Sequence, residues 1–206
     1  SRLMTDTMQG LNSKQIEAVQ TINGPMLILA GAGSGKTKVL TCRIAHLLQQ
    51  GVRPYRILAI TFTNKAAREM RERVDRIAGA AAQSVWLFTF HAFCARVLRY
   101  DIDKLGTYSN NFAIYDTTDT KNIIKQVLKE MNLDDKRFKD TTILNYISNA
   151  KNALQTPIEF AQAAGEFHEQ QVAKIYAAYQ KKLEANNAVD FDDLLLLTLR
   201  LFKENE

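Results

Sequence analysis

The chain has 206 residues, of which 46% are hydrophobic, and its 27 Lys and Arg against 22 Asp and Glu give a formal net charge of +5. This composition excludes a disordered polymer and supplies a core for one or two domains. No apolar run approaches the roughly 20 residues that a membrane helix needs. The polar start at residues 1–6 lacks a signal-peptide segment, and Cys42 and Cys94 are too few for a disulfide framework. We therefore expect a cytosolic protein without a membrane partner.

The charge is distributed unevenly along the chain. Residues 1–107 carry 15 Lys and Arg against 7 Asp and Glu, whereas residues 108–206 carry 12 against 15. A basic first half is compatible with a polyanionic partner such as nucleic acid. Many soluble proteins are mildly basic, so the charge alone does not identify a nucleic-acid-binding protein, and the sequence motifs are needed as evidence.

The first half alternates short apolar runs with segments of helical periodicity. Strands are predicted over 26–30, 57–60 and 85–88, and helices over 36–50, 64–78 and 91–100. The expected buried face of the second helix consists of Ala67, Met70, Val74 and Ile77. The alternation predicts an α/β fold in which right-handed crossovers join the strands of a parallel sheet. Because ligands bind at the carboxyl ends of such strands, the segments that follow the three strands are expected at one edge.

The first of these segments has the pattern of a phosphate-binding loop. Residues 30–37 read Ala-Gly-Ala-Gly-Ser-Gly-Lys-Thr and directly follow an apolar strand. The glycines let successive backbone N–H groups converge on phosphate oxygens at the start of a helix. Lys36 would add a charge for the outer phosphates, and Thr37 a hydroxyl for Mg²⁺. Ala30 stands where the common pattern has glycine, and the alternative is an ordinary glycine-rich turn with a solvated Lys36.

The second half of the chain is mostly helical. After a short strand at 112–115, helices are predicted over 116–131, 141–151, 169–185 and 191–202. Another helix begins at Thr156, with Pro157 in its first position and Glu159 completing a capping box. Residues 108–190 therefore form a small helical domain inserted after the third strand.

A further candidate nucleotide contact precedes the first strand, in the segment Leu11–Val19. Gln15 carries both a donor and an acceptor, which together match the edge of adenine. Asn12, three residues earlier, makes a capping box with Gln15 equally consistent with the pattern. Both roles can coexist.

The segments after the second and third strands offer candidate nucleic-acid contacts. Phe62 can stack on a base, while Thr63 and Asn64 can hold backbone phosphates. The alternative is a Phe62 in the core and an Asn64 that only caps the helix. Thr89 and His91 have polar tips at the same edge, where His91 either donates to a phosphate or anchors the loop.

Two charged segments have simpler interpretations. The helix over 64–78 carries Lys65, Arg68, Arg71, Arg73 and Arg76, with Glu69, Glu72 and Asp75 between them. This spacing favours a solvated face with ion pairs over a DNA-binding face. Asp190, Asp192 and Asp193 precede their apolar run, whereas the acid of a second Mg²⁺ element ends a strand. The three carboxylates therefore suit the first turn of a helix.

In this order and spacing, the segments resemble superfamily 1A DNA helicases of the UvrD/Rep/PcrA group, a family that accepts alanine at position 30. The matching stretches are 11–15, 30–37, 61–67, 89–91 and 190–194. The resemblance implies a P-loop NTPase of RecA-like α/β fold with an inserted all-helical subdomain. Residues 1–107 would form the front of motor domain 1A, residues 108–190 subdomain 1B, and residues 191–206 a helix that returns toward 1A.

By the same resemblance, the parent enzyme would hydrolyse ATP with Mg²⁺ and move 3′→5′ along single-stranded DNA, unwinding at single-strand/duplex junctions. The nucleotide would contact Gln15, Ala32, Gly33, Ser34, Gly35, Lys36, Thr37 and Lys38. Lys36 and Thr37 would be the catalytic residues, and Thr37 would hold the metal. The DNA contacts would be Phe62, Thr63, Asn64, Thr89 and His91. Such a protein works in the cytoplasm, at the nucleoid, in DNA repair or replication.

The resemblance is incomplete. The family's Asp-Glu element, its glutamine and arginine switch motifs and its second motor domain have no counterpart in the sequence. Phosphoryl transfer needs a residue that orients water and usually an arginine. We therefore expect a fragment that binds nucleotide weakly, if at all, and unwinds nothing. Two other functions stay open: a nucleotide-gated DNA-binding or scaffolding module without turnover, and a P-loop kinase for a small metabolite, which leaves 61–67 unexplained.

Overall fold

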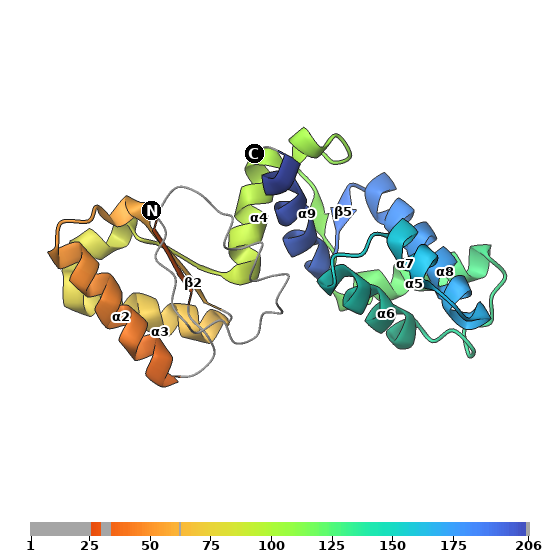
Figure 1. Cartoon of the computed structure of the whole chain (residues 1–206), viewed down its shortest axis with the longest axis horizontal. Coiled ribbons are helices and arrows are strands. Elements are labelled where there is room, and N and C mark those ends of the chain that lie inside the picture. The colour runs from red at the N-terminus through yellow and green to blue at the C-terminus, as the bar shows by residue number, and fades with distance from the viewer. Residues whose placement is uncertain (1–25, 30–33, 62, 205–206) are drawn as a thin grey trace. The chain divides into compact units, whose positions relative to one another are not determined.

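The computed structural model describes residues 26–29, 34–61 and 63–204, and the fold is mostly helical with a small parallel sheet (Figure 1). The chain divides into two compact units, Ser1–Cys94 and Ala95–Glu206. Within the described ranges, no helix combines the length and the apolar character that crossing a membrane requires.

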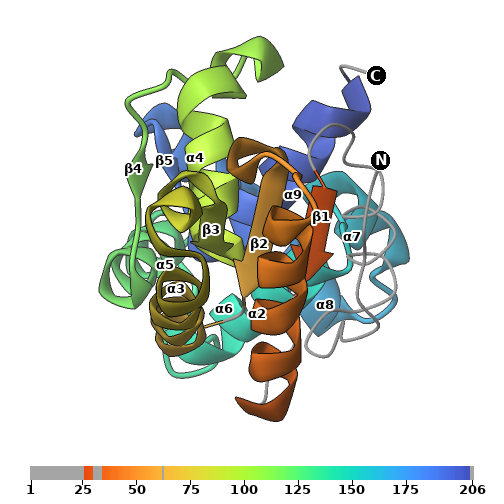
Figure 2. The same ribbon diagram turned by 90° about the vertical axis from the view of Figure 1, so that its left-hand side faces the viewer.

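The first unit is built on three parallel strands, β1 (Met26–Leu29), β2 (Ile57–Thr61) and β3 (Trp86–Thr89), in the order β1-β2-β3. Leu29 lies opposite Ile60, and Thr61 opposite Thr89, so the carboxyl ends of all three strands lie at one edge. Figure 2 shows the strands side by side, with α2 (Ser34–Gln49) in front of them. The predicted alternation and strand direction are confirmed.

Apolar residues of the sheet and its helices form the core of this unit. Besides α2, the helices are α3 (Asn64–Ala78) and the first part of α4 (Phe90–Asp101), with 3-10 turns η1 (Pro54–Arg56) and η2 (Gly79–Ser84). The buried cluster comprises Leu40, Ile44, Ile57, Ala59, Met70, Val74 and Val85. The expectation for Ile77 was wrong: its side chain is 50% exposed. Ile77 lies in the last turn of α3, beside a pocket rather than against the sheet.

The second unit holds a helical bundle whose two chain connections pair with each other. Its elements are η3 (Ile102–Leu105), β4 (Ala113–Ile114), α5 (Thr117–Glu130), α6 (Asp140–Asn152), α7 (Pro157–Ala163), α8 (Phe167–Ala185), β5 (Ala188–Val189) and α9 (Phe191–Glu204). β4 and β5 run parallel, and the N–H of Tyr115 donates to the Val189 oxygen at 2.8 Å. The chain thus enters the bundle through β4 and leaves it through β5. The strand β5 was not predicted, so the inserted segment is not wholly helical.

The helices of the bundle follow their predicted patterns closely. Thr156 accepts from the N–H of Glu159 at 3.2 Å while the Glu159 carboxylate accepts from the N–H of Thr156 at 3.1 Å, so the predicted capping box is confirmed. Asp116 and Asp119 form a second such box before α5. The buried core joins α5, α6 and α8 through Ile123, Ile124, Val127, Leu128, Ile143, Ile147, Val172, Ile175, Tyr176, Tyr179 and Leu183.

Candidate functional site

The carboxyl edge of the sheet collects the starts of three helices. α2 begins five residues after the end of β1, α3 three residues after β2, and α4 directly after β3. Because the strands are parallel, these short connections keep the three helix starts near one edge. This is the edge at which the sequence predicts nucleotide and DNA contacts.

The amino end of α2 suits a phosphate group. Its first turn begins at Ser34 and contains no acidic residue. The partial positive charge of the helix end therefore has no carboxylate of its own first turn to neutralise it, and Lys36 follows within the same turn. Gln15, Ala32 and Gly33 lie outside the described residues. The contacts of Ser34, Lys36 and Thr37 stay predictions.

Lys38 lies at a basic pocket between α2 and α3. The side chain is exposed, and the pocket of about 360 Å³ is lined in the described part of the chain by Lys38, Thr41, Cys42, Arg73, Arg76 and Ile77. None of these residues is acidic. Nη1 of Arg73 is buried and has no hydrogen-bond partner among the described residues. The three cations of the lining favour an anionic ligand in this pocket, beside residues 38–42 of α2.

Thr63, and not Asn64, caps α3. The Thr63 backbone is extended, and its Oγ1 accepts from the N–H of Ala66 at 3.0 Å. Thr61 is buried and donates its hydroxyl to the Thr63 carbonyl at 3.2 Å, which fixes the turn between β2 and α3. Both Thr63 and Asn64 are exposed. Phe62 lies outside the described residues, so its role as a stacking ring stays a prediction.

Thr89 and His91 occupy the corresponding turn after β3. Oγ1 of Thr89 accepts from the N–H of Ala92 at 3.3 Å, which caps the first turn of α4. The His91 ring lies edge-on to the Phe90 ring, with centroids 6.0 Å apart. Burial lowers the pKa of His91, so the imidazole is neutral at physiological pH. The neutral ring could donate a hydrogen bond to a phosphate, whose negative charge would raise the pKa of His91 again.

The charged face of α3 is not purely solvated, contrary to the prediction, because Arg71 bonds to another part of the fold. Its Nη2 donates to the Val85 carbonyl at 2.8 Å and so ties α3 to the residue before β3. Lys65, Arg68 and Arg76 are exposed, as the interpretation requires. The contact was missed because a bond to a backbone carbonyl 14 residues away leaves no trace in the spacing of charges.

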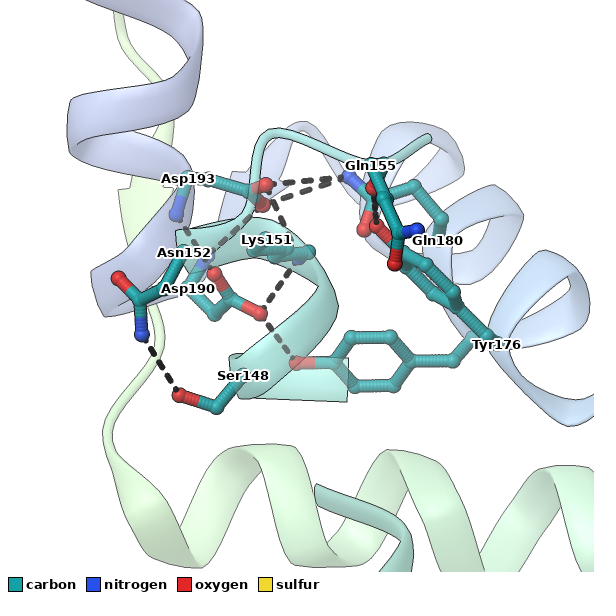
Figure 3. A network of polar contacts seen from close by, with 9 residues as sticks. Ser148, Lys151, Asn152, Gln155, Tyr176, Gln180, Asp190 and Asp193 are labelled. Atoms are coloured by element: carbon teal, nitrogen blue, oxygen red, sulfur yellow. Dashed lines mark hydrogen bonds and ion pairs between the residues drawn. The ribbon is translucent and has the colours of Figure 1, made fainter. Parts of the chain in front are cut away.

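The acidic segment 190–194 begins α9, as predicted. Asp190 directly precedes α9, and Oδ1 of Asp190 accepts from the N–H of Asp193 at 2.8 Å. The N–H of Asp190 donates in return to Oδ2 of Asp193 at 3.2 Å. Both carboxylates also contact Lys151 of α6, which the sequence analysis missed (Figure 3). One signal was available: Lys151 continues the buried stripe of Ile143, Ile147 and Ala150 on α6.

Comparison with known proteins shows to which family the chain belongs. The profile of the UvrD/REP helicase N-terminal domain matches residues 11–206. Over 196 residues the chain is 55% identical to the ATP-dependent DNA helicase PcrA of Bacillus subtilis. The matched stretch covers 95% of this chain and 26% of that relative. Over 201 residues it is 52% and 51% identical to the proteins of the same name from Staphylococcus epidermidis and Staphylococcus aureus, in each case covering 97% of the chain and 27% of the relative. The chain thus spans about a quarter of the length of these relatives. It belongs to the UvrD/REP helicase N-terminal domain family.

Proposed function

We propose that the chain is the nucleotide- and single-stranded-DNA-binding front of an ATP-dependent helicase that moves 3′→5′ and unwinds DNA at single-strand/duplex junctions. The observation that carries this proposal is the shared edge of β1, β2 and β3, where the phosphate-loop helix and both candidate DNA segments begin. Its relatives are named ATP-dependent DNA helicases, which supports the same function. The activity belongs to the full-length protein, and the 206-residue chain alone unwinds nothing.

The finer architecture is part of this proposal. Residues 1–107 form the front of a RecA-like domain 1A, residues 108–190 subdomain 1B, and residues 191–206 a helix that returns to 1A. The three-stranded parallel sheet and the pairing of β4 with β5 at the two ends of the bundle support this division.

ATP and Mg²⁺ would bind at the start of α2. The acid-free first turn of this helix and the basic pocket beside Lys38 fit a nucleotide with its phosphates. When bound, ATP would supply the phosphoryl group that is transferred to water, and Mg²⁺ would neutralise charge on its phosphates. Gln15 would read the base, Lys36 would neutralise charge on the outer phosphates, and Thr37 would hold the metal.

A DNA-stimulated ATPase assay on the full-length protein tests the proposal. We expect single-stranded DNA to accelerate ATP hydrolysis and ATP to drive unwinding of a duplex with a 3′ single-stranded tail, but not of one with a 5′ tail. Binding of DNA that depends on nucleotide, without any turnover, would instead establish the nucleotide-gated DNA-binding or scaffolding module. The kinase alternative loses its support because the chain belongs to a helicase family.

Replacing Phe62 by alanine should weaken DNA binding by the full-length protein. Stacking of a base on an aromatic ring contributes about 1–3 kcal/mol, so the Kd for single-stranded DNA should rise about 5- to 150-fold. Fluorescence anisotropy with a labelled oligonucleotide measures this change. Tyr55→Ala is the matched control, because Tyr55 is an exposed ring at the opposite, amino end of β2. Equal Kd values for Phe62→Ala and wild type would remove the stacking role.

A further inference from the structure

A buried cluster of charges joins α6 to the start of α9. Nζ of Lys151 lies 2.6 Å from Oδ2 of Asp190 and 2.9 Å from Oδ1 of Asp193. The side chains of Lys151 and Asp193 are fully buried, and that of Asp190 is 8% exposed. In every other ion pair of the described residues, both side chains are at least 23% exposed. We call Lys151, Asp190 and Asp193 the α9 latch.

Neutral groups of α8 complete the latch. The Tyr179 hydroxyl donates to Oδ2 of Asp190 at 2.7 Å, and Nε2 of Gln180 lies 3.3 and 3.4 Å from the two carboxylate oxygens of Asp193. Figure 3 shows Lys151 between the two carboxylates, with the amide of Gln180 beside the carboxylate of Asp193. The latch therefore links three helices, α6, α8 and α9, and both carboxylates have their oxygens bonded.

The latch lies at the junction between the end of the bundle at β5 and the start of α9. Asp190 comes directly after β5, where the chain leaves the bundle, and Asp193 lies in the first turn of α9. Apolar side chains of α9 would also hold it against its neighbours, but apolar contacts are not directional. Charged hydrogen bonds fix both distance and angle. The latch thus fixes the start of α9 relative to α6 and α8.

The stability of the fold does not by itself explain why three charged side chains are buried here. Taking three charges out of water costs several kcal/mol per ion, and apolar residues of similar volume often hold a fold as well or better. The cluster also keeps an excess negative charge, since two carboxylates face one ammonium. A role in geometry explains why charges occupy positions that α6 and α9 otherwise fill with Ile, Ala and Leu.

We propose that the α9 latch is a positioning device that couples the helical subdomain to the motor: by holding the start of α9 on the bundle, it makes motion of the ATP-binding part move the bundle as well. This inference rests on the proposed function, which assigns residues 191–206 to a helix that returns to domain 1A. The side chains of the latch are buried, so we assign them no contact with nucleotide or DNA. They act through the orientation of α9.

The test removes the charges of the latch and keeps an acceptor oxygen for each backbone hydrogen bond at the start of α9. The charge-free variant of the full-length protein carries Lys151→Met, Asp190→Asn and Asp193→Asn. Each Asn keeps an oxygen for the N–H groups at the start of α9, and Met has nearly the volume of the Lys stem. Lys182→Met is the matched control, because Lys182 on α8 makes only a partly exposed ion pair with Glu130, at 2.9 Å.

The readout is the number of base pairs unwound per ATP hydrolysed, measured beside DNA-stimulated ATPase and thermal unfolding. We expect the charge-free variant to keep its ATPase within about twofold of wild type but to unwind at least about fivefold less per ATP. The Lys182→Met control should match wild type in both. A merely structural latch would change the unfolding temperature or both activities together, but not their ratio.

Unchanged unwinding per ATP in a folded charge-free variant would overturn the inference. If that variant fails to fold, Tyr179→Phe decides, because it removes only the hydroxyl that donates to Asp190. A smaller but measurable loss of unwinding per ATP then supports the latch, and no loss overturns it. A wild-type protein without DNA-stimulated ATPase would defeat the proposed function and the latch together, whereas an active wild type with an unaltered variant defeats the latch alone.

Discussion

Replacing Lys36 by alanine in the full-length protein should lower DNA-stimulated ATP hydrolysis by at least about 10²–10³-fold, the usual effect of removing one group that stabilises charge in the transition state. The first turn of α2 contains no second cation. Lys38 is two residues further on, on a different side of the helix, and cannot substitute for it. The fall should appear in kcat at saturating ATP and DNA, because the charge on the outer phosphates develops during transfer.

A matched control separates this role from the loss of any positive charge on α2. Arg43 is exposed on the same helix, seven residues or about two turns after Lys36, and Arg43→Ala should leave kcat unchanged. Wild-type turnover by Lys36→Ala would show that residues 30–37 form a turn without a phosphate, and the motor would lose its active site. A loss in kcat for both variants would point to damage to α2 as a whole.

The elements of the fold were predictable because their signals are local. Apolar periodicity and helix-ending glycines mark α2 and α3 within one or two residues, and Thr156 with Glu159 marks the start of α7. The parallel sheet follows because right-handed crossovers leave no other simple arrangement. β5 could not be predicted, since a two-residue strand has no period and its partner β4 lies about 75 residues earlier in the chain.

The candidate site was predictable where a motif and a strand end coincide, and not where one side chain reaches across the fold. Thr63 takes the capping role that the alternative interpretation gave to Asn64, because the residue with the extended backbone is the one whose oxygen faces the helix N–H groups. The partners of Arg71 and Lys151 lie 14 and 39 residues away along the chain. For Lys151, the pattern does hold a clue: a cation on the buried stripe of α6 and an anion on the buried stripe of α9 both require a partner.

Replacing Lys151 by methionine alone should destabilise the 206-residue chain by about 3–5 kcal/mol at about pH 8, because two carboxylates then stay buried without a cation. In the wild type, burial alone would lower the pKa of Lys151, but Asp193 and Asp190 outweigh it and hold that pKa above its ordinary value. Burial raises the pKa of Asp193 to about 6, against the opposing effect of Lys151. Lys151 and Asp193 are therefore both charged at about pH 8.

The pH dependence of this loss has a definite sign. Without the ammonium, the pKa of Asp193 rises further above that of the unfolded chain. A carboxyl with a raised pKa stabilises the fold below its unfolded value and loses this contribution as pH rises through its folded value. The loss in the unfolding free energy should therefore be largest at about pH 8 and smaller at about pH 5, where Asp193 takes up a proton. Urea unfolding at both pH values measures the difference from wild type.

The other charged and titratable groups around the latch do not reverse this sign. They are Tyr108 before β4, Tyr176, Tyr179 and Glu184 of α8, and Asp192 and Arg200 of α9. The pKa values of the three tyrosines are raised, chiefly by burial, so these side chains stay neutral. Burial also raises the pKa of Asp192, which adds to the recovery at low pH.

Two further variants identify the cause of the destabilisation. The charge-free combination with Asp190→Asn and Asp193→Asn should regain most of the stability that Lys151→Met loses, because no buried charge is left unpaired. Lys182→Met should cost no more than about 1 kcal/mol at either pH, as is usual for an exposed ion pair. A loss for Lys151→Met that is the same at both pH values would mean that the lysine stem, and not its ammonium, stabilises the start of α9.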